Sequence, residues 1–320
     1  MDLFAEKRFI EKFEKENNPE RYTYIQEIIS TIFSRYANIR LFTDASFSFI
    51  EESELLTKFS DINTGIEYDL DFDGFFRDKY IPAPQTIILT EVPRQWFTSM
   101  KKQGALCYSY DSYENEIREF IRESHINRIL TGSDNYPFDW SIFQYLRKYE
   151  NYIIITDPYL LRVSDGKIKA NLITLLKTNL DKEREYKIFI IADVTGIDKE
   201  KITQKIELIY QYLDDYQVIV YLINNFRGID NMRIHDRYFF TNHVIVKCGI
   251  GFNLNQNREL SEISGKSIFD FATYRNFRGH FSFLRDYLRE IEKLNPKKEY
   301  KTNNNESFKS FFEIADRISS

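Results

Sequence analysis

The sequence predicts an α/β protein with a mixed, largely parallel sheet flanked by helices, preceded by a smaller α/β region. The main observation is that strand-like apolar runs alternate with amphipathic helices in residues 138–294, which is typical of parallel strands joined by helical crossovers. Residues 233–253 add an antiparallel hairpin and so make the sheet mixed. The chain has 28 Phe and 22 Tyr but only 11 Gly and 7 Pro, which favours long regular elements.

Length and charge limit the function classes. A chain of 320 residues can form one large domain or two ordinary ones. With 42% hydrophobic and 29% charged residues, it is expected to be globular rather than disordered. The net charge of −5 argues against a surface that coats nucleic acid by bulk charge. A small local phosphate site remains compatible with this balance.

The two cysteines, Cys107 and Cys248, lie far apart in the chain and form no metal-ligand pattern. No signal peptide and no apolar run near 18 residues is recognisable, so we expect a cytoplasmic protein without a transmembrane segment. Because Cys248 falls inside the predicted hairpin, we expect it to pack rather than to react.

Residues 1–137 are predicted to form their own α/β region, in which no motif indicates a chemistry. Apolar patterns predict helices over residues 2–16, 21–36 and 114–123, and strands over 39–44, 86–92, 105–110 and 127–132. Asp44 and Glu91 end apolar strands, where α/β proteins often place ligands, but most such acids are helix caps or solvated ends.

Residues 45–82 have no clear pattern. Asp69, Asp71 and Asp73 begin like a calcium-binding loop, but position twelve, which needs a carboxylate, is Tyr80. The alternation of acidic and apolar residues is also typical of a half-exposed strand, and we favour that interpretation.

The elements of residues 138–294 follow one another regularly. We predict helices near 138–149 and over 169–180, 198–214 and 280–294, and strands over 152–161, 186–194, 216–224 and 267–274, with the hairpin before the last strand. Residues 295–306 are expected to be a linker. Residues 307–320 are predicted to form an amphipathic helix that docks on its own domain or on a partner.

The hairpin contains the most informative residues. Strand alternation places His235 and Arg237 on one face, with Cα atoms about 6.5–7 Å apart. An imidazole and a guanidinium at that spacing suit the binding of one phosphate. A half-exposed His and Arg on an ordinary hairpin would give the same pattern.

This arrangement resembles one half of a phospholipase D-type domain. That superfamily has His-x-Lys, four residues, Asp, six residues, Gly-Ser-x-Asn. Here His235, Arg237, Asn242 and Gly249 keep the frame, with Arg in place of Lys and Asn in place of Asp. The final Asn is displaced by one place, to Asn253.

The chain is more similar to the C-terminal phospholipase D-like domain of MIT-domain proteins of the midbody. That group's Asp-Pro-Tyr is matched at 157–159, its Ile-His-Asp-Arg at 234–237 and its Gly-x-Gly at 249–251. The likeness covers residues 138–294, but the family's Asn-Gly-Trp turn is replaced by residues 242–244. No MIT-type three-helix module is recognisable before it, so the role of that module does not carry over.

The resemblance implies a site and two functions. Its central residues would be His235, Arg237 and Asn242, and its further ligand-binding residues would be Asp157, Tyr159, Gly249, Gly251 and Asn253. The MIT-type relatives are regarded as non-catalytic binders of lipid phosphate. We therefore favour a phosphate-binding protein with weak or no hydrolysis, whose ligand is a nucleic acid, a nucleotide or a lipid headgroup.

The alternative is a phosphodiesterase or nuclease. In catalytic members one histidine attacks phosphorus and a second protonates the leaving oxygen, with no metal or cofactor. Only His235 of the four histidines lies in the motif, so this activity would need a homodimer that pairs two copies of it. The Ile-, Asn-, Lys- and Tyr-rich composition suits an AT-rich bacterium, where such an enzyme would fit a defence system. In a third interpretation, the domain is an interaction scaffold whose His and Arg form internal ion pairs.

Overall fold

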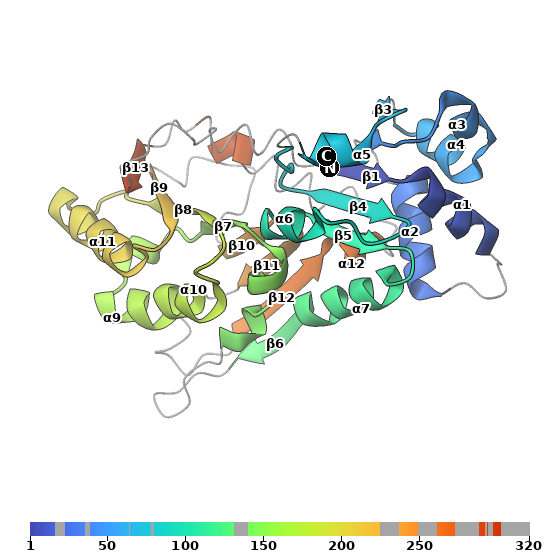
Figure 1. Cartoon of the computed structure of the whole chain (residues 1–320). Coiled ribbons are helices and arrows are strands. Elements are labelled where there is room, and N and C mark those ends of the chain that lie inside the picture. The colour runs from blue at the N-terminus through green and yellow to red at the C-terminus, as the bar shows by residue number, and fades with distance from the viewer. Residues whose placement is uncertain are drawn as a thin grey trace. The chain divides into compact units, whose positions relative to one another are not determined.

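The computed structural model describes residues 1–16, 23–35, 39–63, 65–77, 80–130, 140–224, 237–248, 261–272, 288–291, 293 and 297–301. These residues fall into two compact units (Figure 1). The first contains residues 1–122 and the helix that follows Ser267, and the second contains residues 123–267 and the described residues from 288 onward. Each unit has its own β-sheet.

The first unit is built on a five-stranded sheet in which all neighbouring strands are parallel. In spatial order its strands are β3 (Gly65–Glu67), β2 (Arg40–Phe42), β1 (Asp2–Ala5), β4 (Thr86–Thr90) and β5 (Leu106–Ser109). The chain therefore extends the sheet to one side of β1 and then crosses to the other. The smaller α/β region predicted from the sequence is confirmed.

Helices connect these strands, as parallel pairing requires. They are α1 (Lys7–Glu16), α2 (Tyr24–Arg35), α3 (Phe47–Glu52), α4 (Glu54–Ser60), α5 (Phe72–Arg77) and α6 (Phe97–Lys102). A further helix, α7 (Tyr113–Ser124), follows β5 and leads to the first strand of the second sheet. The helix predicted over residues 2–16 is wrong in its first turn, because residues 2–5 form the central strand. All four are buried, and a strand of four residues is too short to show a period of its own.

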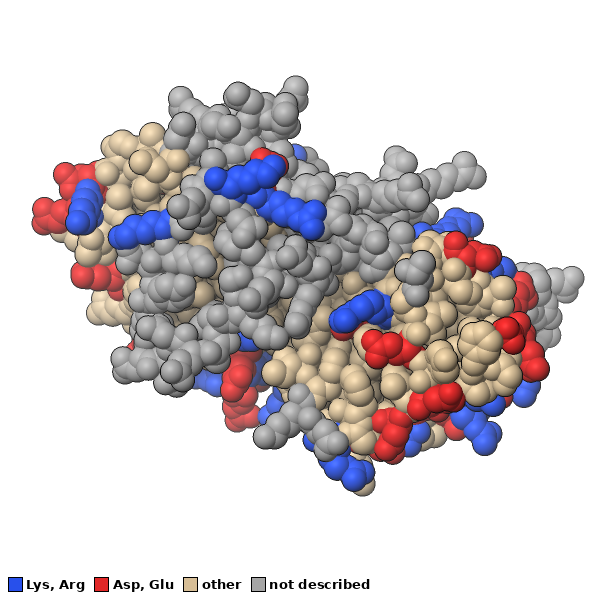
Figure 2. All heavy atoms as spheres, turned by 90° about the horizontal axis from the view of Figure 1, so that it is seen from above, with Lys and Arg blue, Asp and Glu red and all other residues tan. Residues whose placement is uncertain are grey.

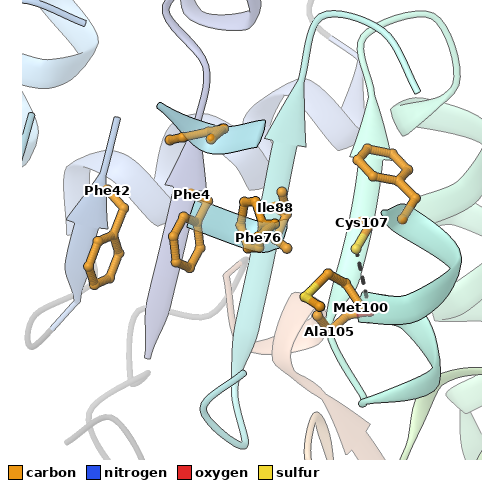
Figure 3. Packing of buried hydrophobic residues seen from close by; sticks show 9 residues of the cluster. Phe4, Phe42, Phe76, Ile88, Met100, Ala105 and Cys107 are labelled. Atoms are coloured by element: carbon orange, nitrogen blue, oxygen red, sulfur yellow. Dashed lines mark hydrogen bonds between the residues drawn. The ribbon is translucent and has the colours of Figure 1, made fainter. Parts of the chain in front are cut away.

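Aromatic side chains fill one side of this sheet (Figure 3). Phe42, Phe4, Ile88 and Cys107 come from four neighbouring strands, and the rings of Phe4 and Phe42 stack with centroids 4.5 Å apart. Helices α5 and α6 cover this layer with further apolar side chains. Burial raises the pKa of the Cys107 thiol, so this cysteine is a packing residue.

The acidic segment near residue 70 leads into a helix. Helix α5 begins at Phe72, and the Oδ1 atom of Asp73 accepts a hydrogen bond of 2.8 Å from the Trp96 indole. Within the described part of the chain, no three His, Cys, Asp or Glu side chains are grouped to hold a metal ion. The half-exposed strand that we favoured here is wrong, since the segment turns into a helix.

The second unit has an eight-stranded mixed sheet. In spatial order its strands are β13 (Lys297–Lys301), β9 (Gln217–Ile223), β8 (Lys187–Asp193), β7 (Tyr152–Thr156), β10 (Arg237–Thr241), β11 (Val244–Cys248), β12 (Ser261–Ser267) and β6 (Ile126–Leu130). Strands β7, β8 and β9 are parallel, and the remaining pairs are antiparallel. The predicted α/β class with a mixed sheet is confirmed.

Helical segments join the strands of this sheet. They are η2 (Trp140–Phe143), α8 (Leu146–Tyr149), η3 (Leu160–Arg162), α9 (Asp165–Ile168), η4 (Lys169–Ile173), α10 (Thr174–Asn179) and α11 (Lys199–Tyr212). In the part of the chain that the structure describes, we find no helix with the length and apolar character needed to cross a bilayer.

Three predictions near the chain's second half need correction. Strand β6 lies in the second sheet, although its residues were assigned to the first region. The strand predicted over 267–274 is instead the end of β12 followed by helix α12 (Ile268–Ala272), which belongs to the first unit. The predicted linker contains β13, which pairs with β9. The helix predicted over 280–294 is described only at 288–291 and 293, and the one over 307–320 lies outside the described residues.

The contact between β12 and β6 leads to a stability prediction. Gly265 lies opposite Ile126, and a Cβ atom added to it would come within 3.0 Å of the Ile126 Cβ. We expect Gly265→Val to lower the free energy of unfolding by about 1–3 kcal/mol, because a branched side chain would force β6 away. Urea unfolding measures this loss. An unchanged unfolding midpoint would show that β6 moves freely, and Gly166→Val, at a position with open space around it, is the control.

Candidate functional site

The predicted hairpin is present, with Asn242 and His243 as its two turn residues. Arg237 pairs with Cys248 across the hairpin, and Phe240 pairs with Ile245. Strand β10 also pairs antiparallel with β7, so its first residue lies beside the carboxyl end of β7. The backbone N–H of Tyr238 donates to the Thr156 hydroxyl at 3.2 Å, which fixes this register.

Arg237 contacts two of the residues that the sequence proposed. Its Nε lies 3.3 Å from Oδ1 of Asp157, and its guanidinium carbon lies 5.0 Å from the centroid of the Tyr159 ring. The Arg237 side chain is 14% exposed and that of Asp157 is 6% exposed. A partly buried guanidinium bonded at Nε and packed on an aromatic ring is held in one orientation.

Asp157 also shapes the loop that carries Tyr159. Its Oδ1 atom accepts from the backbone N–H of Tyr159 at 2.9 Å, and its own N–H donates to the Ile191 carbonyl at 3.1 Å. An Asp side chain that accepts from the backbone two residues later stabilises a tight turn. The carboxylate therefore both orients the guanidinium and caps the loop.

A second Arg–Asp pair lies at the end of the next strand and was missed from the sequence. Nη2 of Arg162 is 3.2 Å from Oδ2 of Asp193 and donates to the Thr195 carbonyl at 2.7 Å. Asp193 ends β8 as Asp157 follows β7, and its Oδ1 accepts from the Thr195 N–H at 2.9 Å. The sequence signal that could have indicated this pair is the Asp found at the end of each of two successive apolar runs.

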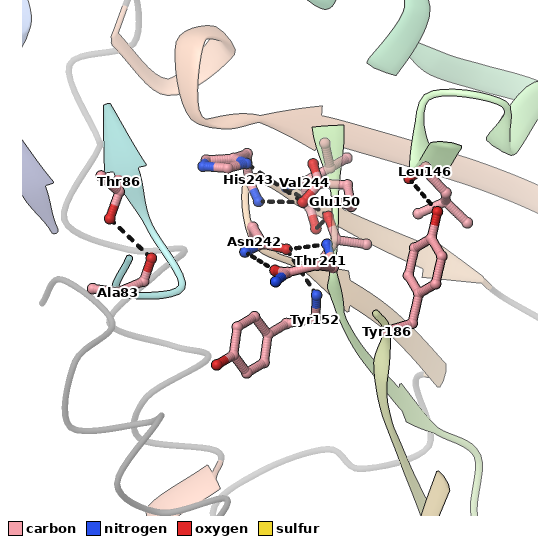
Figure 4. Close-up of polar contacts among 11 residues, drawn as sticks. Ala83, Thr86, Leu146, Glu150, Tyr152, Tyr186, Thr241, Asn242, His243 and Val244 are labelled. Carbon is pink, nitrogen blue, oxygen red and sulfur yellow. Dashed lines mark hydrogen bonds and ion pairs between the residues drawn. The ribbon is translucent and has the colours of Figure 1, made fainter. Parts of the chain in front are cut away.

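Asn242 does not lie near Arg237, so its assignment to the proposed site needs correction. It lies in the turn at the far end of β10, roughly 15 Å away along the strand. Its Oδ1 accepts from the backbone N–H groups of Asn151 and Tyr152, both at 2.9 Å, and its Nδ2 donates to Oδ1 of Asn151 at 2.9 Å (Figure 4). Asn242 is 1% exposed, so it anchors the hairpin and faces no solvent.

The other turn residue is also buried among polar groups. The backbone N–H of His243 donates to Oε2 of Glu150 at 3.2 Å, and its Nδ1 lies 3.4 Å from the same oxygen (Figure 4). Both side chains are fully buried. The turn of the hairpin is therefore tied to the start of β7 at two successive residues.

Four proposed site residues, His235, Gly249, Gly251 and Asn253, lie outside the described residues. The described part of the site is thus Arg237 with Asp157 and Tyr159. The nearby cysteine is unsuited to nucleophilic chemistry, because burial raises the pKa of Cys248 to about 12.

The carboxyl edge of the first sheet carries charged residues that hold the fold together. Glu6 follows β1 and is 3% exposed. Its Oε2 accepts from the Glu91 N–H at 2.6 Å, and its Oε1 accepts from Nε of Arg94 at 3.0 Å. Asp44 accepts from the Lys7 N–H at the start of α1, at 2.6 Å, which is the helix-cap role considered from the sequence.

On the face shown in Figure 2, both acidic and basic side chains are present among the described residues. The net charge of −5 does not favour binding of a polyanion by bulk charge. No known family model matches the chain, and no curated protein matches it significantly.

Proposed function

We propose that the second unit is a phosphate-binding module, in which Arg237 and His235 hold the oxygens of a phosphate or phosphodiester. The observation that carries this proposal is the fixed guanidinium at the carboxyl end of β7. A planar guanidinium binds two oxygens of a phosphate in parallel, and holding it in advance reduces the entropy lost on binding. Ligands of open α/β sheets commonly bind outside the carboxyl ends of the strands.

Two further features support the proposal. The strands β7, β8 and β9 and the hairpin beside β7 agree with the element order that prompted the resemblance to phospholipase D-type domains. Asn242 stands where that motif has Asp, and a carboxylate oxygen there could accept the same two backbone N–H groups. The substitution at this position is therefore compatible with the motif's geometry.

The test is the affinity for a phosphate probe. We expect Arg237→Ala to weaken binding of a short fluorescent oligonucleotide or of inorganic phosphate by about 10–100-fold, since a hydrogen bond to a charged group contributes about 1.5–3 kcal/mol. Arg237→Lys should recover only part of this loss, because an ammonium cannot bind two oxygens in parallel. Fluorescence anisotropy and calorimetry measure both.

Arg162→Ala is the matched control, because it breaks another Arg–Asp pair, between η3 and the end of the neighbouring strand β8. Asp157→Asn tests positioning: it keeps an acceptor for the Tyr159 N–H but removes the charge that orients Arg237.

Thermal melting establishes that each variant is folded. A folded Arg237→Ala protein with wild-type affinity would refute the proposal. Hydrolysis of a diester probe, lost in His235→Ala, would instead identify the module as a phosphodiesterase.

A further inference from the structure

A cavity of about 560 Å³ lies in the second unit between helix α11 and the ends of β9 and β13. Its apolar wall includes Ile202, Ile206 and Leu222, and its polar lining includes Lys199, Asn224 and Lys297. Its volume lies within the range of about 300–1,000 Å³ that is typical of small-molecule sites. The Arg237 site is three strands away in the same sheet, about 14 Å at the usual strand spacing.

The cavity runs along one face of α11. The residues that line it recur at helical spacing, from Lys199 through Ile202 and Ile206 to Tyr210. The buried residues of the helix are Lys205, Ile206 and Ile209, and Ile206 borders both the packed side of the helix and the cavity. Lys205 is bound to the Val163 carbonyl at 2.7 Å, which turns that side of the helix toward the protein.

The positive charges gather at one end of the cavity. Lys199 is the first residue of α11, Asn224 directly follows β9, and Lys297 pairs with Leu222 near the end of β9. Glu207 also lines the cavity, but it lies eight residues along the helix from Lys199, about 12 Å away. Among the residues that the structure describes, no carboxylate forms an ion pair with the Lys199 ammonium.

The acidic residue directly before Lys199 in the sequence is Asp198, and its side chain is engaged in capping the helix. Oδ1 of Asp198 accepts from the Glu200 N–H at 2.8 Å. Two lysines and an asparagine therefore line one end of the cavity, and aliphatic side chains line its middle. This order of groups complements a ligand with an anionic head and an apolar body.

We propose that this cavity binds a small amphipathic anion, with its carboxylate or phosphate head between Lys199 and Lys297 and its apolar body along α11. The ligand's body lies against Ile202 and against the small exposed parts of Ile206 and Leu222, each 7% exposed, and burial of the ligand's own apolar surface contributes to the affinity. The two lysines select the sign of the head group. This site is separate from the one proposed around Arg237.

The experiment uses the full chain and the fluorescent amphipathic anion 8-anilinonaphthalene-1-sulfonate. We expect saturable enhancement of its fluorescence with one site per chain. Decanoate and decyl phosphate should displace the probe, and their relative potency distinguishes a carboxylate head from a phosphate head. Decyltrimethylammonium, with the same apolar chain and the opposite charge, should displace it at least about tenfold less well.

Two variants test the two parts of the site. Lys199→Glu combined with Lys297→Glu should weaken probe binding by about tenfold or more, through reversal of both charges. Thr203→Trp, at an exposed position of the lining, should block the cavity with little effect on the core. Lys201→Glu is the matched control, because it reverses an exposed charge on the same helix outside the lining.

The proposal is overturned by any of three results: no saturable binding, equal displacement by the anionic and cationic probes, or wild-type affinity in the double charge reversal. Arg237→Ala should leave probe affinity unchanged. If that variant loses phosphate binding but binds the fluorescent probe normally, the two sites bind their ligands independently.

Discussion

Replacing Arg94 with Met is expected to lower the free energy of unfolding by about 3 kcal/mol at pH 7. The reason is that Glu6 is 3% exposed and would remain as a buried carboxylate without its cation. Breaking a buried ion pair from one side typically costs about 3–5 kcal/mol, and we take the lower limit because the Arg94 side chain is 33% exposed. Urea unfolding followed by circular dichroism measures the difference between variant and wild type.

The loss in the Arg94→Met variant should depend on pH. Burial already raises the pKa of Glu6 above its usual value of 4.5, and the hydrogen bonds from the Glu91 N–H and from Arg94 oppose that shift. Without Arg94 the pKa rises further. Below about pH 4.5 the carboxyl is protonated in both the folded and unfolded states, so the difference from wild type should shrink there and grow as pH rises.

Glu6→Gln is the companion variant for this pair. It removes the buried charge and keeps an acceptor for the Glu91 N–H, so we expect the Arg94→Met, Glu6→Gln double variant to be more stable at pH 7 than Arg94→Met alone. A destabilisation by Arg94→Met that is equal at pH 4 and pH 7 would contradict the electrostatic explanation. It would instead assign the effect to lost packing of the Arg94 stem.

Replacing Asn242 with Leu is expected to lower the free energy of unfolding by about 3 kcal/mol. Leu has the same branching of side-chain heavy atoms as Asn, but it would leave the backbone N–H groups of Asn151 and Tyr152 and the Asn151 side-chain oxygen without their partner. Each buried polar group left unsatisfied costs about 1–3 kcal/mol. The lower limit for three such groups gives the expected loss, measured by urea or thermal unfolding.

Asn242→Asp separates the two parts of this interaction. A carboxylate keeps the acceptor for both backbone N–H groups but cannot donate to Asn151, so we expect a smaller loss than with Leu. Phosphate binding relative to the folded fraction should change little in either variant, because Asn242 is an anchor far from Arg237. Selective loss of phosphate binding in a fully folded Asn242→Leu protein would show that Asn242 does contribute to the ligand site.

The success of the sequence prediction depended on the length of each element. The long runs that became β7, β8 and β9 were recognised because a nearly continuous apolar run, such as that of β8 with six buried residues out of seven, does not have the pattern of a surface helix. The strand β1 was missed because four residues directly before an amphipathic helix extend that helix's pattern. Strand β13, with three lysines among its five residues, reads as a linker until it pairs with β9.

The residues of the site were predicted only in part. The family resemblance placed Asp157 and Arg237 in one site, and in the structure Nε of Arg237 lies 3.3 Å from Oδ1 of Asp157. The role of Asn242 did not follow, because its partners are backbone N–H groups about 90 residues earlier in the chain, at Asn151 and Tyr152. Almost every residue type has a backbone N–H group, so the sequence does not indicate which residues supply such partners.

The path of the chain constrains how the protein can be divided. Strand β6 forms an edge of the second sheet, α12 returns to the first unit directly after β12, and β13 belongs to the second sheet again. A fragment starting at residue 138 would lack β6 and expose the hydrogen-bonding groups of β12 as a new edge, which favours aggregation. The two units are thus interleaved in sequence, and neither can be released as an intact piece by a single cut.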